Sequence, residues 1–497
     1  LGQLYLYGGQ YTASSKKLRV FSKVRVKIKF TNPKIGQDGK ADYGLGSVSS
    51  AYNQSFKKIY GNILANADIA LANLSPSLVP RRRGPVKGVT AGSAQCGEEM
   101  LVVSHPEFAA ATDSFVDGKN SQGMLTRAVY VGDPGVGSTA ESIRTFVQGE
   151  FSQTNSETGD PCIAPAYLTL IGNTDHVPTF TGDTNAPSTP GDIDYSLASR
   201  NTYVPDLAVG RLPAVTDVDA STMVSKILAY ETATPSSSDA FFKNITITSF
   251  FQNPDVKKNQ DQRGFIRTSE QLRAALLKTG AGYPAKTVER LYSTSNPSGS
   301  TKLMKDDLGR AFPKDIQKTQ KQPPWNVGSQ ANVVKSVKAG RTLLISRDHG
   351  NFDRIFNPAF GSFVPDGSKD SAVTQMSNGA LAPVAWLIAC LSGRFDDPLN
   401  PSFAESMLAK SGGGMVGVLA SSRESPSEVN NSLTMALADA VWPSVLPTGS
   451  KTPIYRMGDV MNAAKLQVLM SGGPSASVDI NNEMRLYNWF GDPSMPL

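Results

Sequence analysis

The chain has 497 residues, more than one ordinary domain of about 100–200 residues requires, so two to four packed units are expected and a single small binding module is excluded. Apolar residues make up 39% of the chain and charged residues 19%, which excludes wholesale disorder. Basic residues exceed acidic ones by six but are scattered along the chain, so no nucleic-acid partner is expected.

Residues 1–80 contain short alternations of apolar and polar side chains, for example at 24–30. Alternation with a period of two predicts half-buried antiparallel strands, so a small β-rich N-terminal region is expected here. A linker rich in basic residues and glycine follows at 81–96, and it opens with three arginines at 81–83. A basic triplet between Pro and Gly is typical of an exposed segment open to trypsin-like cleavage.

After residue 96 the pattern changes to apolar runs that alternate with segments of helical spacing. The predicted strands are 100–103, 128–131, 167–171, 207–209, 245–248, 342–345, 384–389 and 415–420. The predicted helices are 109–116, 140–151, 220–230, 269–277, 331–337, 403–410, 433–441 and 460–470. Such alternation implies right-handed βαβ units, so we expect an α/β fold with a mainly parallel sheet covered by helices on both faces. The longest apolar runs have about eleven residues, short of the roughly 18–20 that cross a bilayer, so no membrane span is expected.

The chain has three cysteines, Cys96, Cys162 and Cys390. The first two each precede a predicted strand at a similar distance. If those strands are parallel neighbours, the two thiols lie at the same edge of the sheet and can form a disulfide; the alternative is two free thiols. Cys390 is left over in either case, and an unpaired cysteine requires its own explanation.

Two predicted strands end in residues that can carry chemistry. The strand at 342–345 leads to His349-Gly350, and the strand at 384–389 leads directly into Cys390. In open parallel sheets ligands bind beyond the carboxyl ends of the strands, so an imidazole and a thiol are expected at one edge. A thiol needs a neighbouring base to become a nucleophile near neutral pH, and a glycine N–H can help to bind an oxyanion. The alternative is a buried structural cysteine beside an unrelated histidine in a turn.

Several further motifs occur in a characteristic order around these strand ends. They are MLVVS at 100–104, FVDGKN at 115–120, YLTLIGN at 167–173, VGRL at 209–212, SFAE at 402–405 and WFGDPS at 489–494. In this order the segment from Cys96 to Leu497 resembles the gingipain family of cysteine peptidases, which share a caspase-like fold. The resemblance implies two caspase-like subdomains, at 97–235 and 236–497, with the second carrying the His/Cys dyad.

The resemblance also implies roles for individual residues. Cys390 is expected to be the nucleophile and His349 the general acid/base, with the backbone N–H groups of Gly350 and Cys390 forming the oxyanion hole. Peptide bonds would then be cleaved through a thioester, in a secreted or cell-surface enzyme that acts on proteins or peptides. By the same resemblance, residues 1–80 correspond to a propeptide remnant and residues 81–83 to a zymogen processing site.

The sequence departs from the family pattern near the dyad. Asp348 precedes the histidine where family members have glycine. The acidic third member of the site is also missing, since the matching positions are Phe251 and Gln252, and Asp255 is the nearest acid downstream. The third member is therefore open between Gln252, Asp255 and a backbone carbonyl.

Charged residues near the strand ends suggest further contacts. Arg347 and Arg423 are expected to border the specificity pocket and would favour an acidic or polar substrate residue; alternatively they are solvated or paired with Asp348 and Glu424. No cofactor is expected to be required. A structural calcium ion could be held by Asp192 and Asp194, as in oxygen-rich loops of related peptidases. His105 and His176 are interpreted as loop residues.

The leading interpretation is a secreted cysteine endopeptidase. One alternative on the same dyad is a sortase-like transpeptidase, in which an amine resolves the thioester in place of water. Another is a catalytically silent surface or secretion scaffold, which the missing acid and Asp348 favour but the retained His349 and Cys390 oppose.

Overall fold

The structure, a computed structural model, divides into two compact units, residues 1–46 and 47–497, and each is described by itself. The described residues are 9–12, 16–20, 59, 96–151, 153–156, 162–181, 188–197, 204–233, 241–252, 260–277, 287–294, 305–313, 316, 328–362, 371–397, 399–443, 445–446, 449–470 and 484–497. In the first unit these include one antiparallel pair, β1 (Gly9–Thr12) with β2 (Lys17–Val20). The alternation at 24–30 and the arginines at 81–83 lie outside the described residues.

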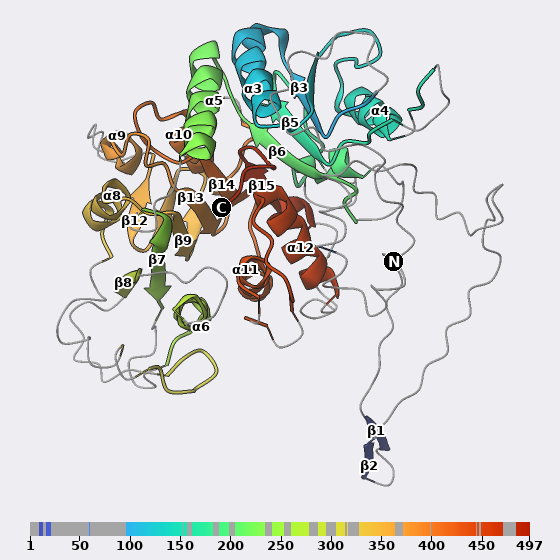
Figure 1. Cartoon of the computed structure of the whole chain (residues 1–497). Helices are drawn as coiled ribbons and strands as arrows, with labels where there is room; N and C mark the ends of the chain where they lie inside the picture. Colours follow the sequence, from blue (N-terminus) through green and yellow to red (C-terminus); the bar gives the residue numbers. More distant parts are fainter. Residues whose placement is uncertain are drawn as a thin grey trace. The chain divides into compact units, whose positions relative to one another are not determined.

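Within the described part of the second unit, ten strands form one sheet in the order β4-β3-β5-β6-β15-β14-β13-β9-β7-β8 (Figure 1). The first half of the sheet consists of β4 (Thr126–Tyr130), β3 (Met100–Ser104), β5 (Tyr167–Ile171) and β6 (Ala208–Leu212). The second half consists of β14 (Gly417–Ser421), β13 (Val384–Ile388), β9 (Leu343–Arg347), β7 (Asn244–Phe251) and β8 (Thr287–Thr294). β15 (Tyr487–Phe490) lies between the two halves. β10 (Gly350–Asn351), β11 (Arg354–Phe356) and β12 (Ala359–Gly361) form a separate small sheet.

β15 joins the two halves of the sheet. It runs parallel to β6 and antiparallel to β14, whereas all other neighbouring strands of this sheet are parallel. The strands of the two halves therefore run in opposite directions, and their carboxyl ends lie at opposite edges. The expected mainly parallel sheet is confirmed, and the eight predicted strands all form, with small shifts at their ends.

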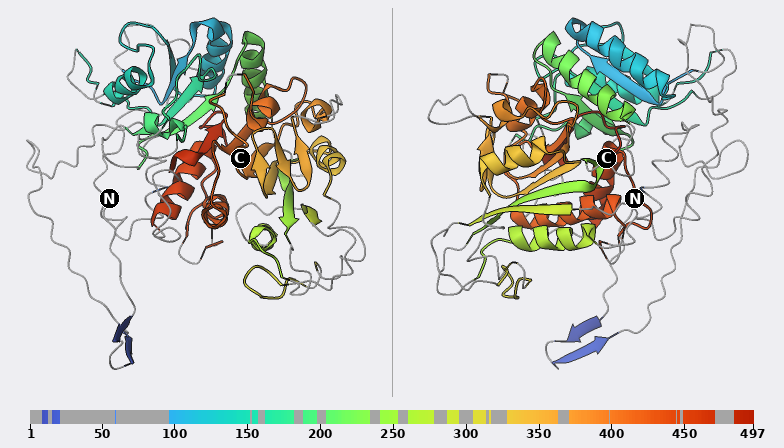
Figure 2. Two further views of the ribbon diagram at one scale, coloured as in Figure 1. Left: turned by 180° about the vertical axis from the view of Figure 1, so that it is seen from behind. Right: turned by 60° about the vertical axis from the view of Figure 1, so that its left-hand side comes forward.

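Helices pack against both faces of the sheet (Figures 1 and 2). The α-helices among the described residues of the second unit are α3 (Ala109–Ser121), α4 (Ala140–Glu150), α5 (Asp217–Thr232), α6 (Phe265–Leu276), α8 (Gln330–Lys338), α9 (Ala372–Gln375), α10 (Phe403–Ala409), α11 (Ser427–Val441) and α12 (Met457–Met470). Alternation along β3 explains the layering: Met100 and Val102 join the core beneath α3 and α5, while Leu101 and Val103 point to the opposite face, against α4. Among the described helices, none is long and apolar enough to cross a membrane.

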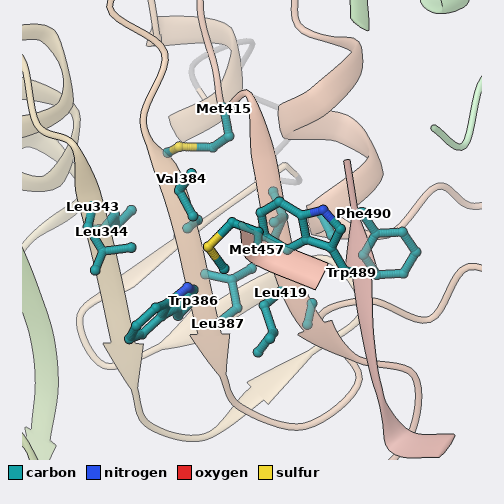
Figure 3. Close-up of a cluster of buried hydrophobic side chains, with 14 of the residues drawn as sticks. Leu343, Leu344, Val384, Trp386, Leu387, Met415, Leu419, Met457, Trp489 and Phe490 are labelled. Carbon is teal, nitrogen blue, oxygen red and sulfur yellow. The ribbon is translucent and has the colours of Figure 1, made fainter. Parts of the chain in front are cut away.

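The core of the second half contains large, fully buried tryptophan side chains. Trp386 lies in the middle of β13, with Leu419 of β14 and Trp489 of β15 farther along the sheet (Figure 3). Its indole ring meets that of Trp442, with ring centroids 6.3 Å apart. Because both faces of β13 and β14 are covered, their sequences are almost continuously apolar, which is why these two strands could be predicted from sequence.

A buried ion pair lies on β6, the strand next to β15 and thus beside the junction of the two halves. Arg211 of β6 is fully buried, and its guanidinium donates two hydrogen bonds to Asp192, at 2.7 and 2.8 Å. The same guanidinium donates to the carbonyl oxygens of Gly172 (2.8 Å) and Val177 (2.7 Å) in the loop after β5. Since a buried charge is tolerated only when paired and hydrogen-bonded, these contacts fix the loop to the sheet.

These contacts bear on the calcium site expected at Asp192 and Asp194. Both carboxylates are buried, and both are held by arginine: Asp192 by Arg211, and Asp194 by Arg485 through two hydrogen bonds of 2.9 Å. Each carboxylate is thus neutralised by a guanidinium that occupies the side on which a cation would bind. These arginine contacts therefore do not favour a calcium ion at the two residues.

We predict that Asp192→Ala lowers the free energy of unfolding by about 3–5 kcal/mol, because it leaves the Arg211 charge buried without its partner. Glu141→Gln, which breaks an exposed pair with Arg144 on α4, is the control and should change it by less than about 1 kcal/mol. Urea denaturation of the two variants measures both values. Equal small effects would contradict the role assigned to Asp192.

Candidate active site

Three neighbouring parallel strands bring the candidate residues to one edge of the sheet. Arg347 of β9 is in register with Ile388 of β13, and His349 and Cys390 each lie two residues beyond that pair. On the other side of β9, Ser249 of β7 is in register with Arg347, and Gln252 lies three residues beyond it. Strands in a sheet are about 4.8 Å apart, so the register alone gathers Gln252, His349 and Cys390 at this edge.

His349 is oriented by Gln252. Its Nε2 lies 2.9 Å from Gln252 Oε1, and its ring meets the edge of Phe265 with centroids 5.1 Å apart. Since an amide oxygen only accepts, Nε2 carries the proton and Nδ1 is the basic nitrogen. Burial lowers the pKa of His349 below its usual 6.5, and the positive charges of Arg263 and Arg347 lower it further. The imidazole is therefore neutral near pH 7, as a general base must be.

Gln252 is itself fixed by the segment that follows it. Its side-chain amide donates to Gln262 Oε1 (3.0 Å), and its backbone N–H donates to Asp261 Oδ1 (3.1 Å). The same carboxyl oxygen accepts from the backbone N–H of Arg263 (3.2 Å). Burial raises the pKa of Asp261 to about 8, so this carboxyl group supports Gln252 mainly in its neutral form near pH 7. Asp255, the other candidate for the third position, lies outside the described residues.

Cys390 is a free thiol on a tight turn after β13. The backbone N–H of Ser425 points at its Sγ from 3.4 Å, and Sγ lies 3.8 Å from the carbonyl oxygen of the same residue. The next residue, Leu391, has a φ of +59°, a left-handed conformation that a leucine adopts only when its surroundings impose it. Its N–H donates to the carbonyl of Arg423 at 3.1 Å, which helps to hold the turn.

Ser425 belongs to a buried polar network behind the thiol. Its Oγ accepts from Asn430 Nδ2 (2.8 Å) and lies 3.3 Å from the hydroxyl of Tyr487 on β15. The Tyr487 hydroxyl in turn donates to Asn430 Oδ1 at 2.8 Å. This closed network fixes the backbone that faces Sγ. Sequence reasoning missed it, because Tyr487 is 57 residues from Asn430 in the chain and no local motif connects them.

Gly350 lies against the turn that carries Cys390. A Cβ added to Gly350 would lie 3.0 Å from the carbonyl oxygen of Cys390 and 3.0 Å from Ala389 Cβ. That spacing is tighter than ordinary contact, so glycine is favoured here. The backbone of Gly350 is therefore near the backbone of Cys390, and sequence analysis expects both residues to donate to the oxyanion.

Arg347 and Asp348, which precede the histidine, are both buried. Arg347 donates to Asn431 Oδ1 and to the carbonyl of Ser427, both at 2.8 Å, and its guanidinium lies 4.4 Å from the ring centroid of Phe265. Asp348 accepts from the backbone N–H of Asn357, and burial raises its pKa well above the usual range. Both side chains therefore serve the scaffold beneath the histidine.

The two arginines expected at the specificity pocket are both engaged by other groups of the protein. Arg347 is enclosed, and Arg423 is neutralised by Asp396 through hydrogen bonds of 2.8 and 2.6 Å. Glu424, expected as a partner of the arginines, is exposed. The two arginines therefore give no reason to expect an acidic substrate residue.

The remaining two cysteines, Cys96 and Cys162, are joined by a disulfide. The neighbouring residues Gly97 and Ile163 form a parallel bridge, which brings the two segments together just before β3 and β5. The pairing thus lies far along the chain from Cys390 and leaves its thiol unpaired.

Comparison with known proteins identifies the family of the chain. The model of peptidase family C25 matches residues 94–497. The chain belongs to peptidase family C25. Two similar relatives from Porphyromonas gingivalis are gingipain R1, 21% identical over 402 residues, and gingipain R2, 22% identical over 405 residues. Each match covers 80% of this chain, but only 32% of gingipain R1 and 43% of gingipain R2, so the chain spans less than half the length of these relatives.

The fold is also that of the family. The crystal structure of gingipain R, an Arg-specific cysteine proteinase, superposes with a TM-score of 0.60 at 18% sequence identity, covering 82% of this chain and 80% of the other. The caspase-like fold and the resemblance to gingipains expected from the sequence are both confirmed.

We predict that the contribution of Asp261 to the free energy of unfolding falls as the pH rises from about 4 to about 8. Its folded pKa of about 8 lies above the ordinary 3.8, so the folded state holds an extra proton between these values. The stabilising contribution is complete below the lower value and is lost as the pH rises through the higher one. In Asp261→Asn the amide oxygen can accept the same backbone hydrogen bonds without titrating. Between about pH 5 and pH 8, the free energy of unfolding of Asp261→Asn, measured by urea denaturation, should therefore fall less than that of the wild type.

Asp117→Asn, at an exposed position of α3, is the matched control and should leave the decline unchanged. Identical pH profiles for the wild type and Asp261→Asn would contradict the assignment of a neutral Asp261.

Proposed function

We propose that this chain is a cysteine endopeptidase in which Cys390 is the nucleophile and His349 the general acid/base. The observation that carries the proposal is that Gln252, His349 and Cys390 follow the ends of three adjacent strands, with Gln252 bound to His349, in a member of peptidase family C25. Protein or peptide chains are the proposed substrates.

In the proposed reaction, His349 Nδ1 takes the proton from the Cys390 thiol as sulfur attacks the carbonyl carbon of the scissile bond. The developing oxyanion is bound by the backbone N–H groups of Gly350 and Cys390. The imidazolium then returns its proton to the leaving amine, the C–N bond breaks and a thioester remains. Water, deprotonated by His349, attacks the thioester and releases the new carboxyl group and the thiol.

The N–H of Cys390 supports this assignment of the oxyanion hole. Among the described residues, no hydrogen bond engages it, whereas the next N–H along the turn, that of Leu391, is taken by Arg423. A donor left without a protein partner beside the nucleophile is suited to a substrate oxygen.

Gln252 sets this site apart from one with a carboxylate in third position. An amide can hold the ring in one tautomer, but it carries no charge to stabilise the imidazolium. The neutral thiol–imidazole pair is therefore the proposed resting state. The thiol would then give its proton to His349 as it attacks the substrate.

The processing of the enzyme and its location are proposed from its resemblance to the gingipains. Residues 1–80 would be the remnant of a propeptide and residues 81–83 its processing site, in a protein that is secreted or held at the cell surface. A cut after residue 83 in the isolated precursor, mapped by N-terminal sequencing, would support this part of the proposal.

Cleavage of a peptide library tests the central proposal. The wild type should cleave, and Cys390→Ala should lose at least about 10³-fold in rate, since the covalent route is removed. Ser432→Ala, at an exposed hydroxyl of α11, is a control that should retain activity. Cleavage that persists in Cys390→Ala would exclude the mechanism.

The same library distinguishes the alternatives. Products that form only when an amine acceptor is added would indicate a sortase-like transpeptidase. No reaction with or without the acceptor, over a broad library, would indicate a silent scaffold, which the uncharged Gln252 favours.

Variants at Gln252 test how the imidazole is oriented. Gln252→Ala should lower kcat by roughly 10²-fold, because the ring loses its fixed position. Gln252→Glu places a carboxylate beside the ring and should raise the pKa of His349, because an opposite charge favours the imidazolium. The acid limb of the kcat/KM profile should then move to higher pH. An unmoved limb would show that this side chain does not contact the working histidine.

A further inference from the structure

We propose that His105, Glu107 and His176 form a zinc-binding site with an open coordination position, separate from the His349–Cys390 dyad. One ligand atom from each of the three residues can be chosen so that all lie within 4.8 Å of one another. The chain has only three histidines, and two of them meet here. The proposal concerns metal binding and does not depend on the proposed peptidase activity.

The topology of the first half of the sheet gathers these residues. β3 and β5 are parallel neighbours, with Ser104 in register with Ile171. His105 directly follows β3, and His176 lies in the loop that follows β5. This is the carboxyl edge of the first half, and the strands of the second half, which carry the dyad, run the opposite way.

The three side chains already lie nearly as close together as the ligands of a zinc ion. Glu107 Oε2 lies 3.4 Å from His176 Nε2 and 3.8 Å from His105 Nδ1, and the two imidazole rings meet edge to face with centroids 4.8 Å apart. Tetrahedral ligands at about 2.0–2.1 Å from zinc are about 3.4 Å apart. Glu107 is exposed and His105 is partly exposed, so small side-chain rotations can close the remaining gap.

A buried asparagine orients the ring of His176 for metal binding. Its Nδ1 lies 2.6 Å from Asn173 Oδ1, and Asn173 is buried. An amide oxygen only accepts, so Nδ1 carries the proton and Nε2, which faces Glu107, keeps its lone pair. A hydrogen bond on the outer nitrogen is the usual way in which proteins orient a zinc-binding histidine.

The loop around His176 is held rigidly by the fold. Gly172 has a φ of +137°, and a Cβ there would lie 2.7 Å from His176 Cβ, so the close approach of the two residues requires glycine. The Arg211 guanidinium binds the carbonyls of Gly172, Asn173 and Val177 on either side of the histidine. Preorganisation of this kind lowers the entropic cost of binding a metal.

The donor set favours zinc among the common divalent metals. Two imidazoles and one carboxylate match the three-ligand sites that bind zinc and leave a fourth position for water or an external ligand. Calcium and magnesium prefer oxygen ligands alone. The ring of Phe108 packs against both histidines, with centroids 6.0 and 4.8 Å away, and provides an apolar wall on one side.

Capping of the short helix at 106–108 does not account for the cluster. His105 is the N-cap of this helix, but its Nδ1 accepts from the Glu107 N–H at a long 3.4 Å. That contact involves neither the Glu107 carboxylate nor His176. The convergence of the carboxylate with two imidazoles from different loops therefore needs another explanation.

Titration of the full chain with ZnCl₂ tests the site. The experiment uses Cys390→Ala as background, because a free thiol beside a histidine can itself bind zinc. Isothermal titration calorimetry should give one zinc ion per chain, and Co²⁺ in its place should show the absorption bands of a tetrahedral site. His105→Ala and His176→Ala in the same background should abolish this binding. Asn173→Ala should weaken it about 10–100-fold.

The matched control is His349→Ala, which removes the third histidine and should leave zinc affinity unchanged. Glu107→Gln, an exposed and conservative substitution, keeps the test valid if a histidine variant fails to fold, and it should weaken binding measurably. The proposal is overturned if Cys390→Ala binds no zinc saturably. It is also overturned if binding survives both His105→Ala and Glu107→Gln, or is lost only in His349→Ala.

Discussion

The ion pair between Arg211 and Asp192 is the interaction on which the arrangement of this protein depends. Arg211 projects from β6, the strand beside the junction of the two halves of the sheet, and its backbone carbonyl accepts the N–H of Gly491 just after β15. The Arg211 side chain thus fixes Asp192 and the loop after β5 to β6, while its backbone carbonyl binds the residue that follows β15. Burying it is tolerable because carboxylate and carbonyl oxygens surround it, and removing any large part of that shell would leave an unpaired charge in the interior.

The chemistry of the candidate site rests on sheet register and on neutral groups more than on charge. Gln252 orients the imidazole, and Asp261, kept largely protonated by burial, holds Gln252. Behind the thiol, Ser425 is fixed by Asn430 and Tyr487, which are likewise uncharged. These groups add no further buried ion to Arg347, but they give no electrostatic help in forming the imidazolium.

Sequence predicted the parts of the molecule that follow from local pattern. Buried parallel strands are continuously apolar, so those ending near His349 and Cys390 were recognised, and with them the expected edge. β15 was not predicted, since its four residues are too few to show periodicity. The pairing of Asp192 with Arg211 and the meeting of His105 with His176 were missed for a different reason. Both depend on which loops the sheet order brings together, and strand order cannot be read from the spacing of apolar residues.

The position of β15 also has a consequence for how the molecule assembles. Its neighbours in the sheet are β6, almost 280 residues earlier in the chain, and β14. Until β15 docks, β6 and β14 are open edges whose unpaired backbone groups can pair with other chains. Closure of the sheet is therefore a late step with a high entropic cost, and the polar network behind Cys390 is complete only after it, because Tyr487 arrives on that strand. A partly made or truncated chain would thus carry the thiol without its finished support.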